Sequence, residues 1–221
     1  MLKLKRVPKH IGIIPDGNRR WALAHELPKE AGYEYGIEPG KKLFESGFDL
    51  GIEEVSVYTF TKENTHRPKE QIEAFKTAFL KFIDWVKHKD VSILVVGDIN
   101  SLYFPEDVKK YAIPEKNRME KKRLNFLVNY NWKWDLSMAL VNHKKKHVGT
   151  SDLMDNIGSR YVSRVDLLIR WGERMRLSGF LPIQCAYADI YVINELWPDF
   201  RVEQFYDALR WYEKQDITLG G

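Results

Sequence analysis

At positions 10 to 22 the chain reads His10-Ile11-Gly12-Ile13-Ile14-Pro15-Asp16-Gly17-Asn18-Arg19-Arg20-Trp21-Ala22. The apolar run at residues 11–14 is short, as expected of a buried strand. Asp16, Gly17 and Asn18 predict a turn, because glycine and asparagine tolerate positive φ and aspartate caps backbone N–H groups. A helix is expected from Arg19 onward. The stretch therefore predicts a strand, a tight turn and a helix start, which is the local unit of an α/β fold.

The same turn is suited to an anionic ligand. The first N–H groups of a helix have no partner within it, and the helix dipole makes that end positive. Arg19 and Arg20 stand beside it, and guanidinium groups match phosphate oxygens well. Asp16 would repel a phosphate unless a divalent cation lay between them. Mg²⁺ is commonly held by one or two carboxylates together with substrate phosphates. The stretch therefore predicts a site for a metal ion and a diphosphate.

Outward from this stretch, apolar runs alternate with helical patterns. Strands are expected at residues 11–14, 55–60, 91–96, 124–128, 165–169 and 190–193. Helices are expected near residues 19–24, up to Phe48, over 68–87 and 106–111, through Met138, and over 202–214. This alternation predicts an α/β fold, with a mainly parallel sheet of about six strands flanked by helices. A length of 221 residues favours one domain over positions 1–221.

Three polar residues each follow one of the expected strands. Asp16, Asn64 and Arg170 lie in the loops after the first, second and fifth strands. Parallel strands bring such loops to one edge of the sheet, and ligands of open α/β sheets bind there. We therefore expect these three side chains to line one site.

The charge of the chain limits its partners. The formal net charge is +4, the pI is about 8.9, and the basic residues are spread along the chain. This mild positive charge fits anionic ligands or an anionic membrane surface and does not require nucleic acid. The run Lys144-Lys145-Lys146-His147 is expected to be a solvated loop.

Cysteine content and hydropathy indicate the compartment. Cys185 is the single cysteine, which excludes an intrachain disulfide or a Cys-x-x-Cys metal site and fits a reducing compartment. The basic residues 1–6 are followed by no apolar segment, so no signal peptide is predicted. No run approaches the roughly 18 apolar residues of a membrane span. We expect a cytoplasmic protein that could touch a membrane surface peripherally.

The chain resembles the cis-prenyltransferases, the undecaprenyl diphosphate synthase family, in five successive segments. Residues 10–22 resemble the family's first signature, in which a His and an apolar strand precede Asp-Gly-Asn-x-Arg-(Trp)-Ala. The other segments follow in the family's order: Phe60-Thr61-Lys62-Glu63-Asn64-Thr65-His66-Arg67-Pro68, Asp166-Leu167-Leu168-Ile169-Arg170 with Arg176-Leu177-Ser178, Gln184-Cys185-Ala186-Tyr187-Ala188-Asp189-Ile190-Tyr191, and Leu196-Trp197-Pro198-Asp199-Phe200. The resemblance covers nearly the whole chain.

The resemblance implies an activity and a set of site residues. The activity is Mg²⁺-dependent transfer of an allylic prenyl group to isopentenyl diphosphate, giving a Z-prenyl diphosphate, by a homodimer. Asp16 and Asn64 would be catalytic, with Asn64 near the proton that is lost, and Asp16 and Asp189 would hold Mg²⁺. Arg67 would hold the allylic diphosphate. Substrate binding is assigned to the set Gly17, Asn18, Arg19, Arg20, Trp21, Lys29, Tyr33, Thr61, Arg67, Arg170, Arg176 and Ser178, of which the last three would hold isopentenyl diphosphate.

The helix expected over residues 68–87 bears on product length. It is shorter than in family members that make polyprenols and carries bulky residues, which favours a short or medium product. Phe75, Phe79, Phe82 and Trp85 form one apolar face of it. That face is either the wall of a prenyl tunnel or plain core packing. The sequence leaves both interpretations open.

Some positions depart from the family pattern. The departures are Lys29 and Tyr33 in the loop where the family has a His, Thr65 for an aromatic residue, Trp171, Glu173 and Arg174 for Thr, Gly and Glu, Asp189 for Glu, and Thr218-Leu219-Gly220-Gly221 without the family's Arg. The segment at residues 171–174 belongs to the acceptor motif. A glutamate there adds a negative charge beside an anion site, so the acceptor motif is the most altered.

Two alternatives therefore stay open. The acceptor could be dimethylallyl diphosphate attacked at an inner carbon, or an alcohol. The chain could also be a catalytically silent subunit that binds a diphosphate lipid or pairs with an active partner. Retention of Asp16, Asn64 and Arg67 argues against silence, and the missing C-terminal Arg argues for it. A phosphatase or nucleotide-binding protein is disfavoured, because no Gly-x-x-x-x-Gly-Lys-Ser/Thr stretch is present.

Overall fold

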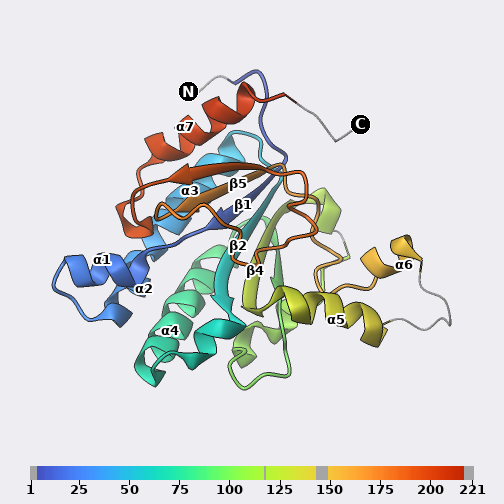
Figure 1. Cartoon of the computed structure of the whole chain (residues 1–221), viewed down its shortest axis with the longest axis horizontal. Helices are drawn as coiled ribbons and strands as arrows, with labels where there is room; N and C mark the ends of the chain where they lie inside the picture. The colour runs from blue at the N-terminus through green and yellow to red at the C-terminus, as the bar shows by residue number, and fades with distance from the viewer. Residues whose placement is uncertain (1–3, 117, 143–148, 217–221) are drawn as a thin grey trace.

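A six-stranded sheet runs through the molecule (Figure 1). The structure, a computed structural model, describes residues 4–116, 118–142 and 149–216. The strands are β1 (His10–Ile14), β2 (Glu54–Thr61), β3 (Val91–Val96), β4 (Lys122–Tyr130), β5 (Leu167–Trp171) and β6 (Asp189–Ile193). Every neighbouring pair is parallel. The predicted α/β fold with a parallel sheet and helices around it is confirmed.

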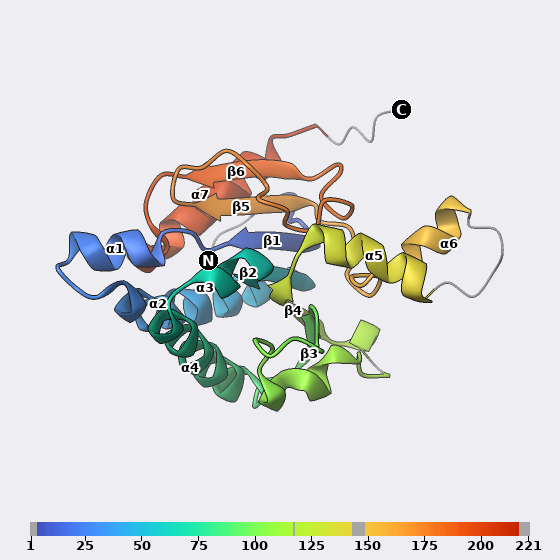
Figure 2. The same ribbon diagram turned by 60° about the horizontal axis from the view of Figure 1, so that its bottom comes forward.

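The order of the strands is β3-β4-β2-β1-β5-β6, which can be followed across Figure 2. From β1 the chain moves to β2 on one side, whereas β5 and β6 lie on the other side of β1. The direction of winding therefore reverses between β1 and β5, and open α/β sheets bind ligands at such a point. Ile14 pairs in register with Arg170 there. The loop carrying Asp16 thus begins beside Arg170.

Three helices cover one face of the sheet: α3 (Ile37–Asp49), α4 (Lys69–Val86) and α7 (Val202–Glu213). Strand side chains alternate between the two faces. Val55 and Val57 point to this side and belong to one buried cluster with Phe44, Phe82 and Leu209. Each helix places its apolar stripe on the sheet, as the three- and four-residue spacing predicts.

The other face is covered by α5 (Trp132–Asn142) and by the chain around residues 157–188. Tyr58 and Leu168 pack there with Phe180 and Leu181. Cys185 is buried in this cluster and is a free thiol. Because both faces are covered, the strands are apolar on both sides, which explains their nearly continuous apolar sequences.

Local structure differs from expectation in the loops. After α1 (Asn18–Ala24), the loop expected at residues 28–33 holds a 3₁₀ turn at Lys29–Ala31 and helix α2 (Gly32–Tyr35). Gly32 is required there, because a Cβ atom would lie 2.0 Å from the Asn18 carbonyl oxygen. A 3₁₀ helix at Lys62–His66 follows β2, and α6 (Thr150–Met154) was not predicted.

Two expectations fall outside the part of the chain that the structure describes: the loop at residues 144–147 and the C-terminal residues 218–221. Among the described residues, no helix combines the length and apolar character needed to cross a bilayer.

A buried ionic network joins the amino ends of the central strands. The fully buried Glu54 carboxylate accepts hydrogen bonds from Arg123 Nε at 2.9 Å, Asn125 Nδ2 at 2.7 Å and the Ser163 N–H at 3.3 Å. Burial raises the pKa of Glu54, but charge on His10 and these hydrogen bonds lower it further, to about 2. A buried carboxylate is tolerated here because each oxygen has partners.

Candidate active site

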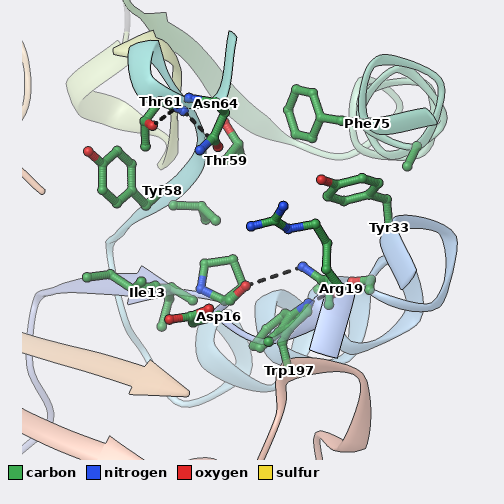
Figure 3. A pocket seen from close by; sticks show the side chains of 18 of the residues that line it. Ile13, Asp16, Arg19, Tyr33, Tyr58, Thr59, Thr61, Asn64, Phe75 and Trp197 are labelled. Atoms are coloured by element: carbon green, nitrogen blue, oxygen red, sulfur yellow. Dashed lines mark hydrogen bonds between the residues drawn. The ribbon is translucent and has the colours of Figure 1, made fainter. Parts of the chain in front are cut away.

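A cavity of about 790 Å³ opens at the carboxyl ends of β1, β2 and β5 (Figure 3). α1, α2, α3 and α4 contribute most of the remaining wall, together with Phe126 on β4, Trp197 and the turn after β5. The predicted site residues that line it are Asp16, Gly17, Asn18, Arg19, Arg20, Lys29, Tyr33, Thr61, Asn64, Arg67, Arg170, Arg176 and Ser178. The fold therefore brings together residues from four separate segments of the sequence. Trp21 and Asp189 are not among the lining residues.

Asp16 lies in the turn that joins β1 to α1. Gly17 has a φ of 111°, which glycine adopts without strain, and the Trp197 N–H donates to the Asp16 carbonyl at 2.9 Å. The Asp16 carboxylate accepts a hydrogen bond from Arg170 Nη2 at 2.8 Å and lies 3.8 Å from Arg20 Nη2. About a third of this side chain is exposed, so it remains accessible from the cavity.

Arg170 connects Asp16 with the turn that follows β5. Its Nη1 donates to Ser178 Oγ at 2.9 Å and to the Arg176 carbonyl. The Arg170 residue is 3% exposed, and its Nε has no hydrogen-bond partner among the described residues. A buried guanidinium N–H without a partner is costly. The Arg170 guanidinium therefore keeps one buried N–H group that no described group pairs.

Arg20 is held by the same turn. Its Nη2 donates to the Gly172 carbonyl at 3.0 Å, and its Nη1 lies 3.4 Å from Glu173 Oε1. Gly172 has a φ of 84°, and a Cβ atom there would lie 2.5 Å from Arg20 Nη2. Glu173, the residue that departs from the family pattern, is thus a counter-ion for Arg20. An anionic ligand would have to compete with it.

A second group of cations lies between α1 and α4. Arg67 Nη1 donates to the Tyr33 hydroxyl at 2.7 Å, and Arg19 Nη1 donates to Gln71 Oε1 at 3.3 Å. Burial lowers the pKa of Arg67, and the Tyr33 hydroxyl acts in the opposite direction. Arginine stays charged at neutral pH despite such a shift. Tyr33 therefore aims the Arg67 guanidinium within the cavity wall.

Thr61 and Asn64 hold each other at the far side of the cavity from Asp16 (Figure 3). The Asn64 N–H donates to Thr61 Oγ1 at 3.3 Å, and the Thr61 N–H donates to Asn64 Oδ1 at 3.3 Å. This reciprocal cap begins the 3₁₀ helix after β2. It fixes the Asn64 side chain and leaves its Nδ2 group for other partners.

The remaining wall of the cavity is apolar and aromatic. It is lined by Ile37, Leu43, Phe44, Phe75, Ala78, Phe79, Phe82 and Phe126. Phe79 is 5% exposed, and its ring centroid lies 5.3 Å from that of Phe126 on β4. The aromatic face of α4 is therefore both core and cavity wall. Trp85 is the exception within this face: it does not line the cavity, and Lys89 Nζ lies 4.8 Å from its ring.

Trp21 is not among the residues that line the cavity. Its Nε1 donates to Asp199 Oδ1 at 2.7 Å, and its ring stacks on His25 at 4.0 Å between centroids. A contact of Trp21 with substrate stays a prediction.

Asp189 lies at the amino end of its strand, whereas Asp16 follows the carboxyl end of β1. It is the first residue of β6 and pairs with Leu167, the first residue of β5, whereas the cavity lies beyond the last residues of these strands. A strand rises about 3.3 Å per residue, so the four steps from Leu167 to Trp171 separate the two ends of β5 by roughly 13 Å. Within one chain, therefore, Asp189 and Asp16 lie too far apart to share a metal ion, and the role of Asp189 as a metal ligand stays a prediction.

The donor set for a metal ion is correspondingly small. The described residues contain no cluster of three or more His, Cys, Asp or Glu side chains that could hold a metal ion. Asp16 is a partly exposed carboxylate at the cation-rich end of the cavity. Mg²⁺ requires few protein ligands when substrate phosphates and water supply the others. A Mg²⁺ ion that enters with a diphosphate fits this arrangement.

Sequence reasoning did not single out Tyr58, Glu63 and Trp197, which also line the cavity. Glu63 and Trp197 both lie within segments that resemble family motifs. Trp197 Nε1 donates to the Gly36 carbonyl at 2.9 Å, which ties the segment before α7 to the start of α3. Tyr58 lies near the carboxyl end of β2, and that position was the available signal.

Comparison with known proteins identifies the family of this chain. Residues 14–220 match the family model described as "Putative undecaprenyl diphosphate synthase". The chain belongs to this prenyltransferase family. An isoprenyl transferase from Chlorobaculum tepidum is 33% identical over 97% of this chain and 86% of its own. A ditrans,polycis-undecaprenyl-diphosphate synthase ((2E,6E)-farnesyl-diphosphate specific) from Haemophilus influenzae is 32% identical over 97% of this chain and 96% of its own.

Solved structures of prenyltransferases share the fold. A lavandulyl diphosphate synthase from Lavandula x intermedia, in complex with dimethylallyl diphosphate, superposes with a TM-score of 0.85, at 23% identity over 97% of this chain and 99% of its own. A probable undecaprenyl diphosphate synthase from Campylobacter jejuni superposes at 0.75, with 24% identity over the full length of both chains. The family and the fold expected from the motifs are both confirmed.

Proposed function

We propose that this prenyltransferase joins an allylic prenyl diphosphate to isopentenyl diphosphate and releases a short- or medium-chain Z-prenyl diphosphate. One observation carries the proposal: the arginine-rich end of the cavity, around Asp16, is continuous with an end walled by phenylalanine side chains. Such a cavity matches a ligand with an anionic head and an apolar tail. Residues 1–221 would form one catalytic domain.

In the reaction, the allylic C–O bond breaks and diphosphate leaves with the electron pair. The alkene of isopentenyl diphosphate attacks the allylic carbon, and loss of a proton completes the new double bond. The cations around the cavity would stabilise the departing diphosphate, since preformed charges cost no reorganisation during the reaction. Arg67 and Arg19 suit the allylic diphosphate, and Arg170, Arg176 and Ser178 suit the acceptor diphosphate. Asn64 would orient the acceptor where the proton is lost.

Asp16 would hold Mg²⁺ together with diphosphate oxygens, and the ion would act as a Lewis acid toward the leaving group. The support for this role is the position of the Asp16 carboxylate beside Arg20 and Arg170, at 3.8 and 2.8 Å. Without a cation, the Asp16 carboxylate would repel a diphosphate. With Mg²⁺ bound, the carboxylate would help to position the diphosphate through the ion.

The aromatic wall supports a short or medium product. The Phe82 ring lies 5.4 Å from Phe44 and 5.8 Å from Phe126, measured between centroids. A Cβ atom at Gly40 would lie 2.8 Å from Phe82, so α3 and α4 pack closely at this point. Little space therefore remains for a long chain between these helices and the sheet.

We also propose that the enzyme is a homodimer. Support comes from exposed apolar side chains on α5 and beside the edge strand β6: Leu140, Val141, Tyr187 and Ile190 are 45–76% exposed. Apolar groups at a sheet edge favour pairing with another chain. Sedimentation of wild type and of Leu140→Glu measures this directly: a monomeric wild type would contradict the proposal.

A cytoplasmic enzyme that touches the membrane peripherally is the third part of the proposal. Met175 is 87% exposed between two arginines, and Leu23, which lines the cavity, is 55% exposed. Apolar side chains next to cations suit the surface of an anionic bilayer. Flotation with anionic and with zwitterionic vesicles tests the contact, and equal recovery in both would exclude it as an electrostatic attachment.

The test of the reaction is a product assay with Mg²⁺, several allylic diphosphates and labelled isopentenyl diphosphate, resolved by chain length and double-bond geometry. Labelled Z-prenyl diphosphates are expected, and chelation of the metal should stop their formation. A matched reaction without isopentenyl diphosphate reports release of diphosphate alone.

A second candidate is transfer to another acceptor, such as dimethylallyl diphosphate attacked at an inner carbon, or an alcohol. The observation that favours it is Glu173, which adds a negative charge 3.4 Å from Arg20 in the altered acceptor motif. Diphosphate release without incorporation of isopentenyl diphosphate would support this candidate. Absence of release with every allylic substrate would instead indicate a silent partner subunit.

A further inference from the structure

The turn after β5 is conformationally strained beside the cavity. Ser178 has a φ of 52° and Gly179 a φ of 83°, so two successive residues occupy the left-handed region. Residues with a Cβ atom rarely adopt that region, and such strain persists only where neighbouring groups impose it. A Cβ atom at Gly179 would lie 2.8 Å from Trp132 Cδ1, so the turn is also tightly packed.

Two side chains hold this turn from opposite directions. Arg170 Nη1 donates to Ser178 Oγ at 2.9 Å and to the Arg176 carbonyl. The Tyr58 hydroxyl donates to the Ser178 carbonyl at 3.1 Å. Arg170 also pairs with Asp16, so it would contribute to both ligand binding and the turn. Tyr58 also lines the cavity, and its hydroxyl hydrogen bond goes to the backbone of the turn.

Tyr58 is itself rigidly placed. It lies on β2, is 8% exposed, and its ring centroid is 5.6 Å from Phe180 and 6.2 Å from Tyr130. Burial, followed by the charge of Glu63, raises the pKa of Tyr58, so the hydroxyl keeps its proton and remains a donor. Because the ring is fixed by strand and core, the position of the hydroxyl is fixed, and its hydrogen bond to the Ser178 carbonyl fixes the turn in one place.

We propose that Tyr58 is a positioning residue for diphosphate binding at Arg170 and Ser178. Its hydroxyl keeps Ser178 in the left-handed conformation, in which Ser178 Oγ and the Arg176 carbonyl both accept from Arg170. This holds the Arg170 guanidinium against Asp16 and keeps the binding groups aligned before the ligand arrives. The inference rests on the proposed function only in taking this end of the cavity as a diphosphate site.

The test compares Tyr58→Phe with Tyr130→Phe. Each substitution removes one hydroxyl from a buried tyrosine, but the Tyr130 hydroxyl donates to Asp135 at 2.6 Å in the core, away from the turn. The dissociation constant of inorganic pyrophosphate is measured by calorimetry, and KM for the acceptor diphosphate by turnover. Tyr58→Phe should weaken pyrophosphate binding and raise KM about five-fold, the change that corresponds to losing one hydrogen bond, with kcat nearly constant. Tyr130→Phe should lower the melting temperature and leave both constants unchanged.

Two further variants make the result decisive. Gly179→Ala disturbs the same turn while keeping the Tyr58 hydroxyl, because its Cβ atom would lie 2.8 Å from Trp132 Cδ1 and at an ordinary contact distance of 3.7 Å from that hydroxyl. It should weaken pyrophosphate binding in the same way. Ser178→Ala removes the ligand group itself. If Ser178→Ala weakens binding and Tyr58→Phe does not, the positioning role is overturned. If Ser178→Ala leaves pyrophosphate binding intact, this end is not a diphosphate site, and it is the proposed function that fails.

Discussion

Charged side chains are arranged differently at the amino ends and at the carboxyl ends of the strands. At the amino ends, Glu54 is fully buried and paired with Arg123 at 2.9 Å and Arg118 at 3.7 Å. At the carboxyl ends, cations outnumber acids: Arg19, Arg20, Lys29, Arg67, Arg170, Arg174 and Arg176 line the cavity together with the carboxylates Asp16 and Glu63. Arg123 also lies 3.7 Å from Glu53, so two acids face two arginines at the amino ends, whereas cations are in excess in the open cavity.

The difference separates structure from function. A balanced buried pair has no charge left for a ligand, but removing one partner leaves the other uncompensated. An excess of one sign in a cavity destabilises the folded chain slightly and attracts a ligand of the opposite sign. Substitutions at the amino ends should therefore change stability, and substitutions at the carboxyl ends should change binding and turnover.

The largest effect is expected for Asp16→Ala. It removes the carboxylate that would hold the metal ion and orient Arg170, so kcat should fall at least about a thousand-fold while the fold persists. Asp207→Ala is the matched control, because it removes an exposed aspartate paired with Arg210 on α7, away from the cavity. Steady-state assays with far-UV circular dichroism measure both properties. Normal turnover in Asp16→Ala would disprove the mechanism.

Glu54→Gln should lower the stability of the fold, because it disrupts the ion pairs at the amino ends of the strands. Losing one partner of a buried ion pair typically costs about 3–5 kcal/mol in the free energy of unfolding. Urea denaturation at pH 7 measures the loss, and Glu34→Gln, which affects an exposed pair with Lys81, should change little. The kcat of folded Glu54→Gln should match wild type.

The pH dependence sharpens the same comparison. Glu54 has a pKa of about 2 in the folded chain, below its usual 4.5, so its stabilisation is complete above pH 4.5. Wild type should lose roughly 3 kcal/mol of stability as the pH falls from 4.5 to 2. In Glu54→Gln the free energy of unfolding should not show this loss between pH 4.5 and pH 2. An unchanged slope would show that other groups cause the acid sensitivity.

Phe79→Ala tests the apolar part of the cavity, where core and wall coincide. The substitution should destabilise the fold by about 3 kcal/mol and lengthen the main product by about one isoprene unit, because it opens space behind the tail. Phe104→Ala, at a buried phenylalanine outside the cavity, should destabilise without lengthening. Product chromatography and thermal melts decide, and destabilisation without a longer product would assign Phe79 to the core alone.

Glu173→Gln should have the smallest effect. Its pair with Arg20 is largely exposed, and such pairs are weak, so releasing Arg20 should tighten pyrophosphate binding only about two- to five-fold. Glu195→Gln is the control, since Glu195 pairs with Arg201 at 3.0 Å. Weaker binding in Glu173→Gln would mean that Glu173 orients Arg20 rather than competing with the ligand. Calorimetric titration distinguishes the two.

Local patterns predicted most of the fold. The β-branched run before Phe60 and the apolar run after Lys122 became β2 and β4, because short apolar runs bounded by turns have few alternatives. The 3₁₀ turns and α2 were not predicted, because they depend on close approaches such as Gly32 against the Asn18 carbonyl. Those contacts join segments that local patterns do not relate.

Some residues of the site were predicted from the sequence and others were not. Asp16, Asn64 and Arg170 line one cavity, as their positions after strands indicated. For Asp189 two signals in the sequence disagreed, because it comes before an expected strand rather than after one. The motif suggested a metal ligand, and the direction of the strand, which decides which edge a residue occupies, argued against it. Strand direction was the more reliable guide within a single chain.

The sequence by itself determined the parallel α/β fold, the turn at Asp16–Asn18 and the family, because these depend on local periodicity and on motifs. Only the tertiary structure decided which charges are paired and which are available. Glu54 and Arg123 are 69 residues apart, and Arg170 and Asp16 are 154 apart. Charge balance depends on distances between such remote residues, and these distances exist only once the sheet has assembled.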